Sequence, residues 1–128
     1  MTTAMTMLGW SAALAFVQMC STAGFLTLTY GIPTSLGNRE GLTPPEGALG
    51  RSVRAHRNMV ESLVVFAAAV LTAHAAGRET ELTALGAQLF FWSRLAYWPT
   101  YLAGIPYLRT IIWTVAITGI LLVLIPLF

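Results

Sequence analysis

The sequence predicts an all-α protein: a bundle of four transmembrane helices that forms a single domain over residues 1–128. Composition is the first observation, because 56% of the residues are hydrophobic, 9% are charged and mean hydropathy is +0.71. Soluble domains carry about 25% charged residues. The second observation is that four apolar stretches each approach or exceed the roughly 20 residues that cross a bilayer as a helix. No alternating pattern supports a barrel, and helices satisfy their own backbone groups in lipid.

The apolar stretches define the helices that we expect, which span residues 5–30, 52–76, 82–103 and 107–128. The first stretch follows no basic segment and is longer than a signal-peptide core, so we expect it to be retained. Residues 31–51, rich in Gly and Pro, form the one long loop. Tight turns are expected at 77–80, where Thr80 is a candidate cap of the third helix, and at 104–106.

Arginine placement predicts the orientation of the bundle. An even number of helices puts both termini on one side of the membrane. The side with the long loop and the last turn carries most of the arginines: Arg39, Arg51, Arg54, Arg57 and Arg109. On the other side, Arg78 is offset by Glu79 and Glu81. The positive-inside rule therefore predicts that the loop side is cytoplasmic and that both termini lie outside, unless the arginines instead line a binding site.

Charge and cysteine content exclude several functions. A net charge of +2, without a basic face, does not provide a nucleic-acid-binding surface. The single cysteine, Cys20, excludes an intrachain disulfide or a zinc framework. No Cys/His set has metal-ligand spacing, so we expect no metal. The seven cations are all arginines, which indicates either multidentate anion binding or an arginine-rich genome.

A polar face on the second helix is the strongest candidate site. Arg54, Arg57, Asn58 and Glu61 stand at i, i+3, i+4 and i+7, so they share one face. Glu61 lies two to three turns into the helix, where a charge costs about 2.5–3.5 kcal/mol and a short side chain cannot reach the interface. Glu61 therefore needs a partner, either an arginine of the same face or a ligand amine. A purely structural bundle, in which the charges pair only with one another, is the alternative.

Two neighbours of that face have simpler explanations. Arg51, like Arg54, is near enough to the helix start to reach the interface by snorkelling. His56 points away from the face, in the direction of a neighbouring chain. The position of each residue can be explained without a binding site, although both stay candidates for ligand binding.

The third helix repeats the pattern. Arg94, Tyr97 and Tyr101 occupy i, i+3 and i+7 of one face, although tyrosines also form interfacial aromatic belts. Arg94 lies mid-segment and carries the same cost as Glu61, so we expect an Arg94–Glu61 ion pair across the bundle. At the start of the fourth helix, Arg109 is either a site residue or an interface anchor.

The charge set predicts a ligand with at least two anionic groups and one cation. Glutathione fits, because it has two carboxylates, one ammonium group and an ionisable thiol. Arginines would bind the carboxylates in bidentate fashion, and Glu61 would bind the ammonium group. A further arginine would lower the thiol pKa and so favour the reactive thiolate. An anionic lipid headgroup would also satisfy the arginines but has less need of Glu61.

These residues resemble the signature of the MAPEG family, the membrane-associated proteins in eicosanoid and glutathione metabolism. The second-helix run from Arg54 to Glu61, followed by Phe66, carries the resemblance. The run from Arg94 to Tyr97 with Tyr101, and then Arg109-Thr110, resembles the family's third- and fourth-helix motifs. The resemblance covers nearly the whole chain.

The resemblance implies a homotrimer that binds glutathione between subunits near the cytoplasmic side. It assigns catalysis to two residues: Arg109, which would stabilise the thiolate, and Thr110, which stands where some relatives carry serine. The candidates for glutathione binding include Arg39, whose alignment is looser, and Arg94 of the third helix. The full set is Arg39, Arg51, Arg54, His56, Arg57, Asn58, Glu61, Arg94, Tyr97 and Tyr101. Two positions depart from the pattern: Val64 replaces a common proline, which predicts a straighter helix, and Trp113 replaces a tyrosine.

We therefore expect a glutathione transferase or peroxidase of a bacterial branch, in the inner membrane, with its active site facing the cytoplasm. Glutathione is the co-substrate, no metal is used, and the second substrate is a lipophilic electrophile or hydroperoxide from the bilayer; an eicosanoid is not expected. The alternative is a non-catalytic membrane protein that binds glutathione or a lipid-like ligand.

Overall fold

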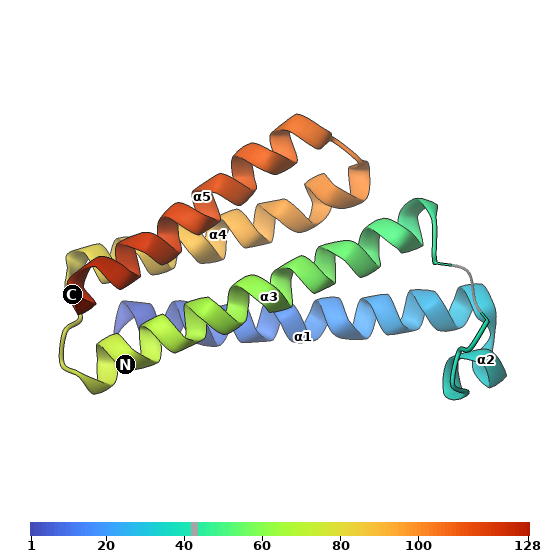
Figure 1. Ribbon diagram of the computed structural model, residues 1–128, viewed down its shortest axis with the longest axis horizontal. Helices are drawn as coiled ribbons and strands as arrows, with labels where there is room; N and C mark the ends of the chain where they lie inside the picture. Colours follow the sequence, from blue (N-terminus) through green and yellow to red (C-terminus); the bar gives the residue numbers. More distant parts are fainter. Residues whose placement is uncertain (42–43) are drawn as a thin grey trace.

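The computed structural model describes residues 1–41 and 44–128, and every secondary-structure element within them is helical (Figure 1). The expected all-α class is therefore confirmed. The elements are α1 (Thr3–Tyr30), α2 (Ile32–Leu36), α3 (Gly47–Ala75), α4 (Glu81–Ala103), α5 (Pro106–Leu124) and a final 3₁₀ turn, η1 (Ile125–Leu127). Four long helices appear where the apolar stretches predicted them. The short α2 was not predicted.

The long loop predicted over 31–51 is wrong at both ends, and residues 42–43 of it lie outside the described part. Gly31, with φ of +86°, ends α1, and α2 follows with Pro33 in its first turn. At the other end α3 begins at Gly47 rather than at residue 52. A Cβ on Gly50 would lie 2.3 Å from the Pro45 carbonyl oxygen, so this glycine permits close packing and does not break the helix.

Helix caps confirm the two tight turns. The Thr80 hydroxyl accepts a hydrogen bond from the Thr83 amide (3.4 Å), and the Thr83 hydroxyl accepts one from the Thr80 amide (3.1 Å). This reciprocal pair is a capping box, which confirms the predicted cap of the third long helix. At the far end of α4, Gly104 is left-handed (φ +76°) and Pro106 starts α5 at once.

The four long helices form two antiparallel pairs, α1 with α3 and α4 with α5, joined through contacts of α4 with α1 and α3 (Figure 1). Both termini lie at the end of the bundle that holds the α3–α4 turn, as the even number of long helices predicted. The short helix α2 and the α4–α5 turn lie at the opposite end. Towards that end α5 diverges from α3.

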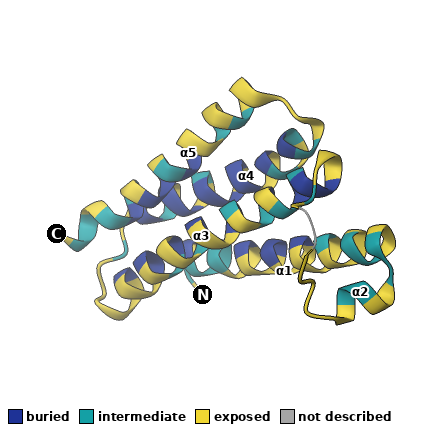
Figure 2. Cartoon of the chain, turned by 45° about the vertical axis from the view of Figure 1, so that its right-hand side comes forward, coloured by how far each residue is buried: buried dark blue, intermediate teal, exposed yellow. Residues whose placement is uncertain are grey.

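Three of the helices, α1, α3 and the α5–η1 segment (residues 106–127), are long and apolar enough to cross a membrane. The prediction of four spans is thus supported for three. The helix α4 has 23 residues but includes Glu81, Arg94 and Pro99, which lower its apolar character. Exposed residues lie along the outer faces of the helices (Figure 2), and large apolar residues such as Trp10 and Ile111 are among them. Apolar outer faces suit contact with lipid.

The packed core lies towards the end that holds the termini. Phe66 of α3 stacks on Phe90 of α4 with ring centroids 4.0 Å apart. There α4 and α5 come into backbone contact at Gly86 and Gly119, as small residues allow in membrane helix pairs. This end is closely packed, whereas α5 diverges from α3 at the other end, which leaves room for a pocket near the α4–α5 turn.

Gly119→Ala is expected to destabilise the α4–α5 pair by about 1–3 kcal/mol, the usual cost of overpacking. The added Cβ would lie 2.6 Å from the Gly86 carbonyl oxygen and 2.8 Å from the Phe90 amide nitrogen. Thermal unfolding in detergent measures the effect. Gly9→Ala is the matched control, because nothing lies within 4 Å of a Cβ at that position of α1. Equal unfolding temperatures for the two variants would contradict the prediction.

Candidate functional site

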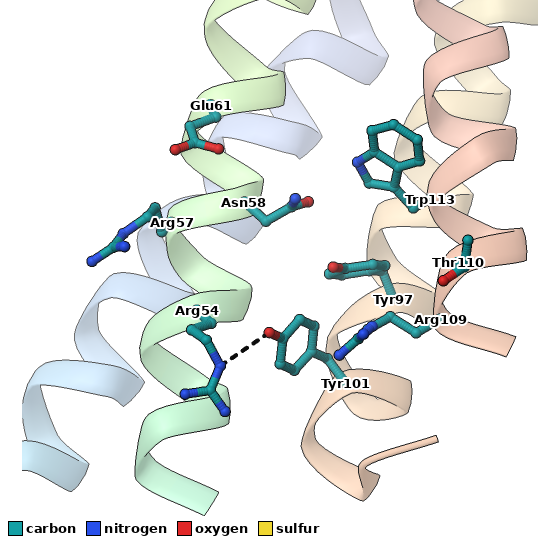
Figure 3. Close-up of a pocket in the computed structure, with 9 residues that line it drawn as sticks. All are labelled: Arg54, Arg57, Asn58, Glu61, Tyr97, Tyr101, Arg109, Thr110 and Trp113. Carbon is teal, nitrogen blue, oxygen red and sulfur yellow. Dashed lines mark hydrogen bonds between the residues drawn. The ribbon is translucent and has the colours of Figure 1, made fainter. Parts of the chain in front are cut away.

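A pocket of about 470 Å³ opens between α3 on one side and α4 with α5 on the other (Figure 3). Each helix contributes side chains with polar or aromatic groups. The lining residues are Arg54, Arg57, Asn58 and Glu61 from α3, Tyr97 and Tyr101 from α4, and Arg109, Thr110 and Trp113 from α5. Eight of these nine were singled out by spacing or by resemblance, so the structure brings most of the candidate residues together.

The α3 wall consists of the four residues that helical spacing placed on one face. Asn58 extends towards the α4–α5 wall, whereas Arg57 extends away from it in the view of Figure 3. Arg57 and Glu61 are exposed and Asn58 is half-buried. The Oδ1 of Asn58 is buried and accepts no hydrogen bond within the described residues, so this acceptor is left unsatisfied beside the pocket.

The opposite wall consists of two buried tyrosines and the start of α5. Arg54 Nε donates to the Tyr101 hydroxyl at 3.2 Å, which joins α3 to α4 across the floor of the pocket. The guanidinium of Arg109 lies over the Tyr101 ring, with Cζ 4.6 Å from the centroid. Tyr97 stands beside Tyr101 with centroids 5.5 Å apart. Tyr101 therefore sets the positions of two arginines from different helices.

Thr110 lines the pocket but directs its hydroxyl proton elsewhere. Its Oγ1 donates to the Pro106 carbonyl oxygen at 3.2 Å, within the first turn of α5. The hydroxyl oxygen can still accept a hydrogen bond from a ligand. A catalytic role for Thr110 stays a prediction.

The expected ion pair between Arg94 and Glu61 is wrong for the described part of the chain. Arg94 is 1% exposed, and its guanidinium lies over the Tyr97 ring with Cζ 4.2 Å from the centroid. It therefore lies behind the pocket wall and not in the wall. Glu61 is left with no ion pair among the described residues. The pocket holds three guanidinium groups and one unpaired carboxylate, which is an arrangement that suits a ligand with both anionic and cationic groups.

The one ion pair within the described residues lies at the far end of the bundle, 3.0 Å long between His74 Nδ1 and Glu79 Oε2. Thr2 also donates to Glu79, at 2.7 Å. Partial burial acts to raise the pKa of Glu79, but the hydrogen bonds from His74 and Thr2 outweigh it and lower that pKa below its ordinary value. These contacts fasten the start of α1 to the α3–α4 turn and take no part in the pocket.

Three further candidates also lie outside the pocket lining. Arg39 is exposed, and its Nε and Nη2 donate to the Ser35 carbonyl oxygen at 3.2 and 2.9 Å. Arg51 Nε donates to the Leu102 carbonyl oxygen at 3.0 Å, which braces α3 against the end of α4. His56 is half-buried, is not part of the pocket lining, and lies by helical spacing on the side of α3 opposite the polar face. Ligand binding by these residues stays a prediction.

Trp113 is a pocket residue that spacing could have found. It stands four residues after Arg109, so both occupy one face of α5. By itself a tryptophan near the start of this helix indicates no site, and the sequence marks Trp113 only as a departure from the family pattern. In Figure 3 the indole faces Asn58 across the pocket.

A second, largely apolar cavity of about 320 Å³ continues from the first along α3 and α5. Asn58, Glu61 and Trp113 line both cavities. The remaining lining residues of the second cavity are mostly aliphatic: Ser62, Val65, Ile117, Ile120 and Leu121. A polar, cationic compartment thus adjoins an apolar one. Within the described residues no three His, Cys, Asp or Glu side chains cluster closely enough to hold a metal ion.

Comparison with known proteins gives one match. A model of the MAPEG family matches residues 7–128 of this chain. The match includes all four long helices except the first residues of α1. No curated protein and no solved structure matches the chain.

Proposed function

This chain belongs to the MAPEG family, and from that premise we propose that it is a membrane glutathione transferase or peroxidase. Family membership and the three apolar helices make it an integral membrane protein. The observation that carries the proposal is the junction of two compartments. The polar compartment has the charges that glutathione needs, and the apolar one suits a lipophilic reactant from the bilayer.

The polar compartment can complement each charged group of glutathione. Arg54 and Arg57 would bind the carboxylates, since guanidinium groups bind carboxylates in bidentate fashion. Glu61, which has no ion-pair partner among the described residues, would bind the ammonium group. Asn58 would accept a peptide N–H through its unoccupied Oδ1. A simple anionic headgroup would leave Glu61 without a cation, so the carboxylate favours the zwitterionic ligand.

Arg109 would stabilise the thiolate. A nearby positive charge lowers a thiol pKa, because it favours the ionised form. The thiolate sulfur would attack the electrophilic carbon of a lipophilic substrate, form the C–S bond and release the leaving group as an anion. With a hydroperoxide, the thiolate would take the terminal oxygen and leave an alcohol; a second glutathione would then give the disulfide and water.

The proposal includes a homotrimer, which is the assembly that the family resemblance implies. Arg57 and Glu61 are exposed on a helix that is apolar enough to cross a membrane, so a neighbouring copy against α3 would shield their charges from lipid. His56, which points away from this pocket, would then serve the pocket of the next subunit. We place the protein in a bacterial inner membrane with the pocket facing the cytoplasm and both termini outside, because the arginines concentrate at the pocket end.

The experiment is to purify the protein in detergent, measure glutathione binding by calorimetry, and assay two reactions: conjugation of an aromatic halide and reduction of a lipid hydroperoxide. We expect binding and turnover in at least one assay. Arg78→Ala, at the opposite end of the bundle, is the control and should behave as wild type. Absence of glutathione binding would contradict the proposal. Binding without turnover would show a membrane protein that binds glutathione and would contradict the proposed catalytic activity.

A further inference from the structure

Arg94 is the largest fully buried side chain of the described chain, at 1% exposure. None of its three guanidinium nitrogens has a hydrogen-bond partner among the described residues. A buried guanidinium stays charged, and leaving it without partners costs stability. A hydrophobic side chain of similar volume commonly stabilises such a position. Arg94 therefore calls for an explanation other than core packing.

Arg94 is the first member of a stack of four side chains that ends in the pocket. Its Cζ lies 4.2 Å from the centroid of Tyr97. Tyr97 stands 5.5 Å from Tyr101, with ring planes inclined at 59°. Tyr101 in turn supports Arg109, whose Cζ lies 4.6 Å from the ring centroid. Both cations are within the roughly 6 Å at which a guanidinium is attracted by an aromatic face. Figure 3 shows Tyr97, Tyr101 and Arg109 together in the pocket wall.

The side chain of Arg109 has no other anchor. It makes no hydrogen bond and no ion pair within the described residues, and its guanidinium lies over the Tyr101 ring. Tyr101 is itself held, by the hydrogen bond from Arg54 on one side and by Tyr97 on the other. The Tyr97 ring in turn carries the Arg94 guanidinium over its face.

We propose that Arg94 is a positioning residue: through the cation–π ladder Arg94–Tyr97–Tyr101–Arg109 it fixes where the Arg109 guanidinium lies in the pocket. Arg94 touches no ligand and acts through the two rings. The proposal rests on the proposed function, because its consequence is read at the glutathione thiol. When Arg94 is removed, Tyr97 loses its cation, the ring pair loosens, and Arg109 no longer holds the thiolate at a fixed distance.

The test uses the whole protein in detergent and measures the ultraviolet absorbance of bound glutathione thiolate against pH. Arg94→Met is expected to move the midpoint of thiolate formation up by about one pH unit, which is about a tenfold loss of thiolate below the midpoint. The Kd for glutathione should change by much less than tenfold. Arg94→Lys, which keeps the charge but not the planar guanidinium, should show a smaller shift. Arg78→Met, an arginine outside the ladder, is the matched control.

A double-mutant cycle distinguishes the positioning role of Arg94 from a purely structural one. Arg94→Lys in a Tyr97→Leu background should produce no further shift, because the ring that transmits its effect is absent. Additive shifts, or a wild-type midpoint in Arg94→Met, would overturn the ladder while leaving glutathione binding intact. If Arg94→Met fails to fold, the Arg94→Lys cycle decides. Wild-type protein that binds no glutathione would refute the proposed function and, with it, the role given to Arg94.

Discussion

Replacing Arg109 with alanine is expected to lower the turnover of bound glutathione at neutral pH by about 10- to 30-fold. A cation within a few ångströms of an acid lowers its pKa by about 1–3 units. A free thiol with a pKa of about 8.5 is only about 3% thiolate at pH 7, so full ionisation raises the thiolate fraction by at most about 30-fold. Arg109 is the arginine of the α4–α5 wall, where it lies over Tyr101 and is paired with no carboxylate of the described chain. Glutathione affinity should fall much less than turnover, since Arg54 and Arg57 still line the pocket.

The pH profile separates loss of the charge from loss of the pocket. Without Arg109 the thiol pKa rises towards that of a free thiol, about 8.5. Turnover should therefore recover as the pH is raised through that value, whereas a damaged pocket would stay inactive at every pH. Arg109→Lys keeps a cation and should retain more activity than Arg109→Ala. Equal turnover for Arg109→Ala and wild type at neutral pH would assign the thiolate to another residue.

Helical periodicity was sufficient to predict which residues of one helix line the same wall of the pocket. Residues of α3 at i, i+3, i+4 and i+7 line one wall of the pocket, as their spacing predicted. The pairing of α3 with the α4–α5 wall required more, because spacing says nothing about which faces meet. There the family resemblance supplied the prediction, and the structure places Tyr97, Tyr101 and Arg109 opposite α3.

The failed predictions share a physical cause, which is that side-chain direction and backbone approach depend on tertiary packing. Arg94 shares a face with Tyr97 and Tyr101 by spacing, yet its long side chain folds behind Tyr97 instead of reaching Glu61. Gly50 belonged by composition to a loop, but it lies in α3 because it packs against the Pro45 carbonyl. Neither the direction of the Arg94 side chain nor the start of α3 before Gly50 can be predicted from composition or from helical periodicity.

Local signals performed better where they act through the backbone alone. Thr80 caps α4 and Gly104 ends it, and both turns fall where the sequence placed them. The divergence of α5 from α3 has no comparable signal. The close contact of Gly86 with Gly119 holds α5 against α4, and it forms only when these two helices meet.

Glu61→Ala is expected to weaken glutathione binding by about 10- to 150-fold. A hydrogen bond between charged groups contributes about 1.5–3 kcal/mol, and each 1.4 kcal/mol is a factor of ten in Kd. Glu61 is the one carboxylate of a pocket that contains three arginines, so it is the group that can bind the ammonium of a zwitterion. The loss should appear in Kd and at subsaturating glutathione, while turnover at saturation changes less.

A glutathione analogue without the amino group gives the matched control for Glu61. The analogue should bind wild type about as weakly as glutathione binds Glu61→Ala, and the substitution should not weaken the analogue further. Removing a carboxylate from among three arginines also lowers the repulsion of an anion, so an anionic lipid headgroup should bind Glu61→Ala at least as tightly as wild type. If glutathione binding is likewise unchanged or tighter in Glu61→Ala, the ammonium is not held by Glu61. The pocket would then be an anion site, which is the alternative that the arginines alone would have favoured.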